Sequence, residues 1–234
     1  MRAIILSVTL LLFGFASSNQ SDQCSLCHSN SEPSLPRRNA IPPPLLPTAY
    51  SMNWDMYEFS GSQRPPRAEL SQPLGVIHGS TYYDWSRKSM TEIYRERCID
   101  IFPEGRDYPC QFTSIADKTF FIRFAKSEAH QVESCCLWRR EPFWPPRPDV
   151  LRVMSYDQQQ SWQGVDTTWW ILDTPEPGPF GYGLSGGRPV AFWFPVISGW
   201  VQQVFRDFST VAPASAPFEL PVICRATSLP QCDL

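Results

Sequence analysis

Lysine is scarce in this chain: three lysines stand beside seventeen arginines, and the 234 residues carry a formal net charge of -3. The sequence contains no basic patch and no run of arginines interleaved with aromatic residues. Because nucleic-acid binding needs such a patch to neutralise phosphates, the composition argues against a nucleic-acid partner.

Histidine is equally scarce, and its spacing fits none of the common metal motifs. His28, His78 and His130 are the only imidazoles, and no two of them have the spacing of ligands on one helix. The sequence also contains no H-E-x-x-H, EF-hand or P-loop pattern. We therefore predict no catalytic metal and no cofactor.

Long apolar runs are absent after the N-terminus, so the rest of the sequence predicts no transmembrane anchor. The one such run is Ile4–Phe15, which follows Arg2 and precedes the small residues Ala16-Ser17-Ser18. It is too short to span a bilayer and is typical of a secretory signal peptide, which we assign to residues 1–18. We expect the mature protein to be soluble and secreted, either extracellular or in the lumen of the secretory pathway.

Cysteine is abundant by comparison. All eight cysteines follow the predicted cleavage point, and their number is even. In an oxidising compartment this pattern predicts a framework of disulfide bonds and disfavours metal or thiol chemistry. The expected disulfide cysteines are Cys24, Cys27, Cys98, Cys110, Cys135, Cys136, Cys224 and Cys232.

Proline and aromatic residues favour an all-β fold. The chain has 24 prolines, 12 glycines, 9 tryptophans and 15 phenylalanines, which suits short strands joined by Pro/Gly turns. Residues 19–47 form a proline-rich N-terminal arm, followed by a single β-rich domain over 48–225 and a C-terminal tail over 226–234. The arm holds the one glycosylation sequon, at Asn19.

Alternation of polar and apolar residues predicts strands at short intervals. From Tyr50 to Met56 every second residue is apolar, which places one face of a strand against a core. Further strands are predicted at Leu74–Asp84, Met90–Arg97, Cys110–Ile115, Thr119–Phe124, Gln131–Leu137, Asp166–Leu172, Arg188–Pro195 and Trp200–Arg206. The one predicted helix is short, at Asp149–Met154.

Two short motifs resemble catalytic or cofactor signatures. Cys24-Ser25-Leu26-Cys27-His28 matches the C-x-x-C-H pattern of covalent haem attachment, but it lies in a proline-rich arm of a strand-rich chain. Gly183-Leu184-Ser185-Gly186-Gly187 matches the G-x-S-x-G turn of hydrolases, but a strand is predicted after it and no histidine follows His130. A disulfide in the arm and a glycine-rich hairpin loop are the simpler interpretations.

Three acidic residues flank one loop of the predicted domain. Asp100, Glu104 and Asp107 could together assist a calcium ion. Solvated acidic residues of a turn are the simpler interpretation, and we predict no metal there.

Several segments follow one another in a recognisable order. They are Gly79–Asp84, Met90–Arg97, Gln111–Arg123, Cys135–Leu137, Pro148–Leu151, Asp166–Trp170, Phe205–Phe208 and Phe218–Cys224. This order resembles that of the ependymin-like secreted proteins, and the resemblance implies a strongly bent antiparallel sheet over an apolar pocket, similar to the fold of bacterial lipoprotein carriers. The chain departs from the simpler family pattern at the adjacent Cys135 and Cys136, the extra Cys24 and Cys27, and the tail Cys232.

Adjacent residues of a strand point to opposite faces, so Cys135 and Cys136 are expected to bond different partners. We expect one of them to reach Cys224 and the other an earlier strand, at Cys110 or Cys98. The fold class predicted in sum is a β-rich, disulfide-stapled clamshell of bent sheet with one or two short helices.

The resemblance implies a non-enzymatic protein that binds an apolar or lipid-like molecule inside the bent sheet. The candidate pocket residues, chosen for aromatic character on predicted strands, are Trp54, Tyr82, Phe121, Trp169, Phe192 and Trp193. The alternative is a structural or adhesive component of an extracellular matrix or surface assembly, with other extracellular proteins or itself as partner. In that case the same aromatic residues would pack the core.

Overall fold

A computed structural model describes residues 42–61, 64–66, 73–100, 106–127, 131–138, 145–174 and 178–232. Within them the chain is all-β, with few helical residues, as predicted. The signal peptide, the sequon at Asn19 and the haem-like motif from Cys24 to His28 lie outside the described residues. The same is true of Glu104 and His130.

The described chain forms 11 strands and three short 3₁₀-helices. The strands are β1 (Ala49–Phe59), β2 (Gly75–Asp84), β3 (Ser89–Tyr94), β4 (Cys110–Ile115), β5 (Lys118–Phe124), β6 (Val132–Leu137), β7 (Ser155–Trp162), β8 (Val165–Leu172), β9 (Phe180–Ser185), β10 (Arg188–Val196) and β11 (Gly199–Ser209). The helices are η1 (Val150–Val153), η2 (Ala216–Phe218) and η3 (Val222–Arg225).

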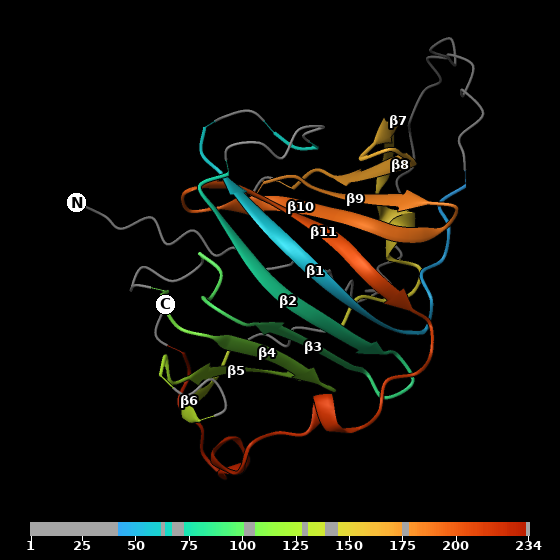
Figure 1. Ribbon diagram of the computed structural model, residues 1–234. Helices are drawn as coiled ribbons and strands as arrows, with labels where there is room; N and C mark the ends of the chain where they lie inside the picture. The colour runs from blue at the N-terminus through green and yellow to red at the C-terminus, as the bar shows by residue number, and fades with distance from the viewer. Residues whose placement is uncertain are drawn as a thin grey trace, which may run out of the picture.

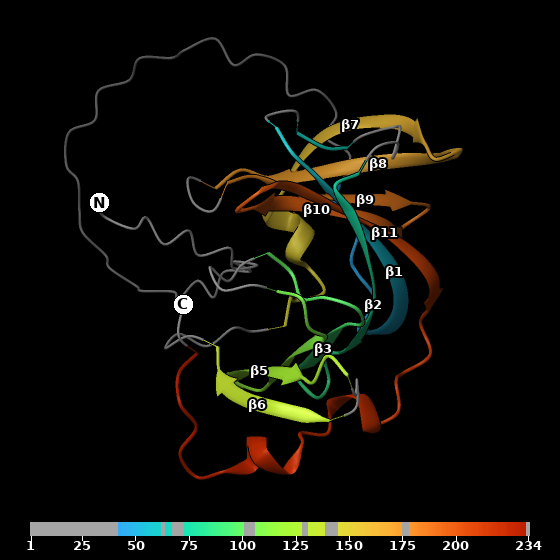
Figure 2. The same ribbon diagram turned by 60° about the vertical axis from the view of Figure 1, so that its left-hand side comes forward.

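All the strands belong to one antiparallel sheet made of two meanders. Strands β1 to β6 run outward in sequence order, and β7 to β11 run back from the other edge until β11 pairs with β1. Figure 1 shows β1 and β11 side by side in the middle of the sheet. In Figure 2 the sheet bends strongly, so that its two ends turn toward each other and η1 lies on the concave side. This is the bent sheet that the sequence predicts.

The main hydrophobic core fills the concave side. Along β1 the residues Tyr50, Met52, Trp54 and Met56 are buried and alternate with partly exposed neighbours, as the sequence pattern predicts. Trp54 lies across Gly79 of β2, where a Cβ atom would come within 2.1 Å of the indole ring. Glycine is therefore required there for the close approach of ring and backbone.

The sequence pattern missed two strands. Strand β7 is built mostly from exposed polar residues at the free edge of the sheet, so no apolar alternation marks it. Strand β9 contains Gly181 and Gly183, which leave room for the indoles of Trp193 and Trp169 on the neighbouring strands. The glycines resemble a loop in sequence, but they are needed because large rings pack directly on the backbone.

The G-x-S-x-G motif forms the hairpin between β9 and β10. Ser185 pairs with Arg188, and Gly186 and Gly187 make the turn with φ values of 54° and 81°. Two consecutive positive φ angles are the geometry of a two-residue hairpin turn. The interpretation of this motif as a glycine-rich hairpin is therefore confirmed.

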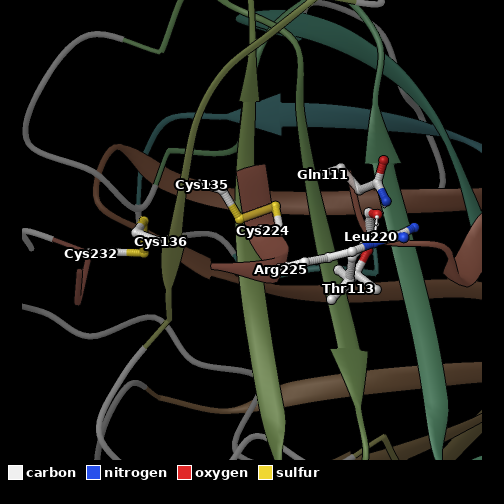
Figure 3. The surroundings of a disulfide bond; sticks show 8 residues. All are labelled: Gln111, Thr113, Cys135, Cys136, Leu220, Cys224, Arg225 and Cys232. Atoms are coloured by element: carbon white, nitrogen blue, oxygen red, sulfur yellow. Dashed lines mark hydrogen bonds between the residues drawn. A yellow bond between two sulfur atoms is a disulfide. The ribbon is translucent and has the colours of Figure 1, made fainter. Parts of the chain in front are cut away.

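Three disulfide bonds lie within the described residues. Cys135 bonds Cys224, which is one of the partners that the sequence suggested. Cys136 bonds Cys232, whereas Cys98 and Cys110 bond each other, so the expected link from a vicinal cysteine to an earlier strand is wrong. Figure 3 shows the two neighbouring cysteines with their separate partners.

The C-terminal segment explains the pairing of Cys136. It runs beside the edge strand β6, where Leu137 donates a backbone hydrogen bond to Pro230 and accepts one from Cys232, both at 2.9 Å. Because Cys135 and Cys136 point to opposite faces of β6, η3 meets one sulfur and the following segment meets the other. This segment also covers an edge that would otherwise present unpaired backbone groups.

Candidate functional site

A cavity opens on the concave side, between the two halves of the bent sheet. Its walls come from β1, β2 and β3 on one side and from β9, β10 and β11 on the other, with η1 beside them. Aliphatic and aromatic side chains make up most of the lining. The lining residues are Leu46, Tyr50, Met52, Thr81, Met90, Glu92, Pro146, Val150, Met154, Phe180, Tyr182, Phe192, Gln203 and Phe205.

The cavity is narrow, and its walls are adaptable. The space open to the centres of water molecules is about 40 Å³, and the empty volume is about 520 Å³ when the open mouth is counted. The smaller of these two volumes holds a few water molecules. Met52, Met90 and Met154 line the space, and unbranched methionine side chains can change rotamer to fit an irregular guest.

Three tyrosines hold one wall of the cavity together. Tyr50 stacks on Tyr83 with ring centroids 4.6 Å apart, and its hydroxyl shares a hydrogen bond with that of Tyr182. The Tyr83 hydroxyl donates to the backbone oxygen of Pro146, which ties the segment before η1 to the sheet. Burial raises the pKa of all three phenols well above the usual value, so they remain uncharged hydrogen-bond donors.

Two polar side chains, Glu92 and Gln203, line the cavity among its apolar residues. Glu92 of β3 is partly buried, and this burial raises the pKa of its carboxyl to about 7. Gln203 of β11 is 4% exposed. A polar group that loses water when a ligand enters is costly unless the ligand supplies a partner.

Replacing Glu92 with glutamine is expected to flatten the pH dependence of stability. The folded-state pKa is raised from its usual 4.5 to about 7, so burial penalises the charged form and stability falls as the pH rises between these values. By about pH 8 the Glu92→Gln variant should be more stable than the wild type by up to about 3 kcal/mol. Urea unfolding at both ends of the range measures this difference.

Glu96→Gln is the matched control for that experiment, because Glu96 lies four positions further along the chain and its side chain, beside His78, is 53% exposed. This variant measures what the loss of an exposed carboxylate does to stability at the two ends of the pH range. Parallel profiles for wild type and Glu92→Gln would show that the Glu92 carboxyl is not desolvated.

The structure brings one of the six predicted pocket residues, Phe192, to this cavity. Trp54 packs edge-on against Tyr94 in the main core, and Phe121 packs against Phe112 at the far end of the same core. Tyr82 is partly buried on the strand position between Thr81 and Tyr83. Aromatic character alone did not separate core positions from lining positions.

Trp169 and Trp193 belong to a separate cluster. They are buried in one cluster with Trp162, Ile171 and Ala191. Along β8 and β10 the members of this cluster alternate with residues of the main core. The two indoles therefore pack on the opposite face of the sheet from the cavity. The sequence signal that could have separated the clusters is strand parity: Phe192 is one position away from Trp193.

The acidic residues considered for calcium are engaged with protein groups where the structure describes them. Asp100 accepts a backbone hydrogen bond from Ser198, and Asp107 pairs with Lys126. Across the described ranges, no three His, Cys, Asp or Glu side chains are grouped so that they could hold a metal ion. Nor does any helix in that part of the chain have the length and apolar character needed to cross a membrane.

Comparisons with known proteins bring structural likenesses only. No known protein-family profile and no curated protein matches the sequence. An uncharacterized conserved protein from Thermus thermophilus is 10% identical, with a TM-score of 0.44, over 76% of this chain and 88% of that one. The lipoprotein LppX of Mycobacterium tuberculosis is 9% identical, with a TM-score of 0.32, over 69% of this chain and 86% of the other.

A DUF1329 family protein from Desulfovibrio piger is 10% identical, with a TM-score of 0.22, over 74% of this chain and 90% of that one. Likenesses of this extent carry nothing about function. The function of the site therefore has to be inferred from its own residues.

Proposed function

We propose that this is a non-enzymatic protein that binds an apolar, lipid-like ligand in the concave cavity. The observation that carries the proposal is the lining itself, in which aliphatic and aromatic side chains surround a small number of polar groups. This is the usual composition of a small-molecule binding site. The three lining methionines support the proposal, because they allow the narrow space to widen around a guest.

We further propose that the protein acts outside the cell or in the secretory lumen. Three disulfide bonds among the described residues support this location, since such bonds persist in oxidising compartments. Membership of the ependymin-like family is also a proposal. It rests on the order of the motifs in the sequence and on the bend of the sheet.

Filling the cavity is expected to weaken ligand binding strongly. Val150 on η1 lines the space, so the indole in Val150→Trp should occupy it. With N-phenyl-1-naphthylamine as an uncharged fluorescent apolar probe, we expect saturable binding to the wild type and at least about tenfold weaker binding to the variant. Fluorescence titration measures both affinities, and circular dichroism checks that the fold is retained.

Val153→Trp is the matched control, because Val153 lies on the same short helix but is 53% exposed. It should bind the probe as the wild type does. Equal binding by wild type and Val150→Trp would place the ligand elsewhere. No binding at all, together with defined oligomers on a non-reducing gel, would favour the structural or adhesive alternative.

A further inference from the structure

The cavity holds one acidic side chain that an apolar ligand alone would leave without a partner. Glu92 contributes its carboxyl group to an otherwise uncharged lining and is partly buried there. Most of its neighbours in the lining are aliphatic or aromatic. A ligand that supplies the missing partner would gain a charge-assisted hydrogen bond in a low-dielectric setting.

The charge at this end is of one sign. Among the described lining residues Glu92 is the only side chain that carries a full charge, and no lysine, arginine or histidine lines the space. The other titratable groups near its carboxyl are the phenols of Tyr50 on β1, Tyr94 on β3 and Tyr182 on β9. The elements β2, η1, β10 and β11 contribute uncharged lining residues. An anionic ligand would therefore meet repulsion with no compensating cation.

Three aromatic rings line the same cavity as Glu92. Tyr182 lies 5.5 Å from Phe192 and 5.9 Å from Phe205 between ring centroids, and all three line the cavity. The faces of such rings attract cations. A carboxylate and aromatic faces in one apolar cavity match a protonated amine better than a hydroxyl or a carboxylic acid.

This step rests on the proposed function: we propose that the cavity selects apolar ligands that carry a cationic amine, with the Glu92 carboxylate as counter-charge. The apolar part of the ligand lies among the methionines and aromatic rings. The ammonium group restores a neutral pair inside the cavity, which is the condition under which a buried charge is tolerated.

Three ligands of equal chain length test this proposal: octylamine, octanol and octanoate, titrated calorimetrically at about pH 8. We expect octylamine to bind at least about tenfold tighter than octanol, and octanoate to bind most weakly. In Glu92→Gln the affinity for octylamine should fall about tenfold, while that for octanol should change less than about threefold. Glu96→Gln, at an exposed carboxylate of the same segment, should behave as the wild type.

The pH dependence provides a second readout. Octylamine binding to the wild type should weaken as the pH falls from about 8 to about 5, because protonation of Glu92 removes the counter-charge, and binding to Glu92→Gln should change little. If octanol binds but octylamine binds no tighter, or if Glu92→Gln leaves the amine affinity unchanged, the amine selection is wrong and the apolar site stands. If neither octanol nor octylamine binds, the proposed function fails as well.

Discussion

Removing the two disulfides that anchor the C-terminal segment is expected to lower the free energy of unfolding by about 7 kcal/mol, a loss close to the whole stability of many domains. The bonds Cys135–Cys224 and Cys136–Cys232 close loops with sequence separations of 89 and 96. One loop of this size contributes about 4–5 kcal/mol in the chain-entropy model. The variant with all four cysteines replaced by serine should therefore be largely unfolded at 37 °C.

Removing either bond alone should cost much less. The two bonds start at neighbouring residues, so while one is intact the other closes an additional loop of only about ten residues, which contributes about 3 kcal/mol. The two single-bond losses should then sum to less than the loss in the four-serine variant. Urea unfolding measures the loss for each bond in a paired serine variant. The two variants are Cys135→Ser with Cys224→Ser, and Cys136→Ser with Cys232→Ser.

The bond Cys98–Cys110 provides the control, since it closes a separate loop with a sequence separation of 12. Its removal should cost about 3 kcal/mol and should add to the loss of either C-terminal bond. If the two single-bond losses instead sum to the loss in the four-serine variant, the two C-terminal bonds constrain the unfolded chain independently of each other.

The second large effect concerns the carboxylate of Glu58, which is 1% exposed on β1. Arg97 and Arg106 both pair with it, Arg97 at 2.7 Å between nitrogen and oxygen. Replacing both arginines with methionine leaves a buried charge without a partner. We expect the free energy of unfolding to fall by about 3–5 kcal/mol, measured by urea unfolding at neutral pH.

A third substitution separates charge from packing. Adding Glu58→Met to the two arginine substitutions removes the stranded charge, so most of the lost stability should return. Lys126→Met is the surface control, because Lys126 and its partner Asp107 are 69% and 76% exposed, and it should cost less than about 1 kcal/mol. A double arginine variant as stable as the wild type would show that Glu58 is not held by these pairs.

Short apolar stretches between turns were enough to place most of the strands, and in β1 the buried residues also alternate regularly. Cys110–Ile115 is predicted and found with the same bounds, and β1 extends the predicted alternation from Tyr50 to Met56 at both ends. The strand β3 ends at Tyr94, before the predicted end at Arg97. The pattern failed at β9, where glycines make room for tryptophans of neighbouring strands.

The candidate site was much less predictable. Trp54, Trp169 and Trp193 have the composition of pocket residues, but each ring packs on a glycine of a neighbouring strand, and Trp169 also contacts Trp162. Glu92 carries no motif and sits in a short strand among polar and apolar neighbours. Its importance depends on β9 and β11, which lie about 90 to 110 residues later in the chain and form the opposite wall.

By itself the sequence determined the all-β class, the period-two face of β1 and the hairpin at Gly186-Gly187, because these depend on neighbours within a few residues. Only the tertiary structure decided which cysteine Cys136 meets and which side chains share the cavity with Glu92. Those choices depend on the pairing of β11 with β1 and on the bend of the sheet. Both bring together residues whose distance in space no local pattern encodes.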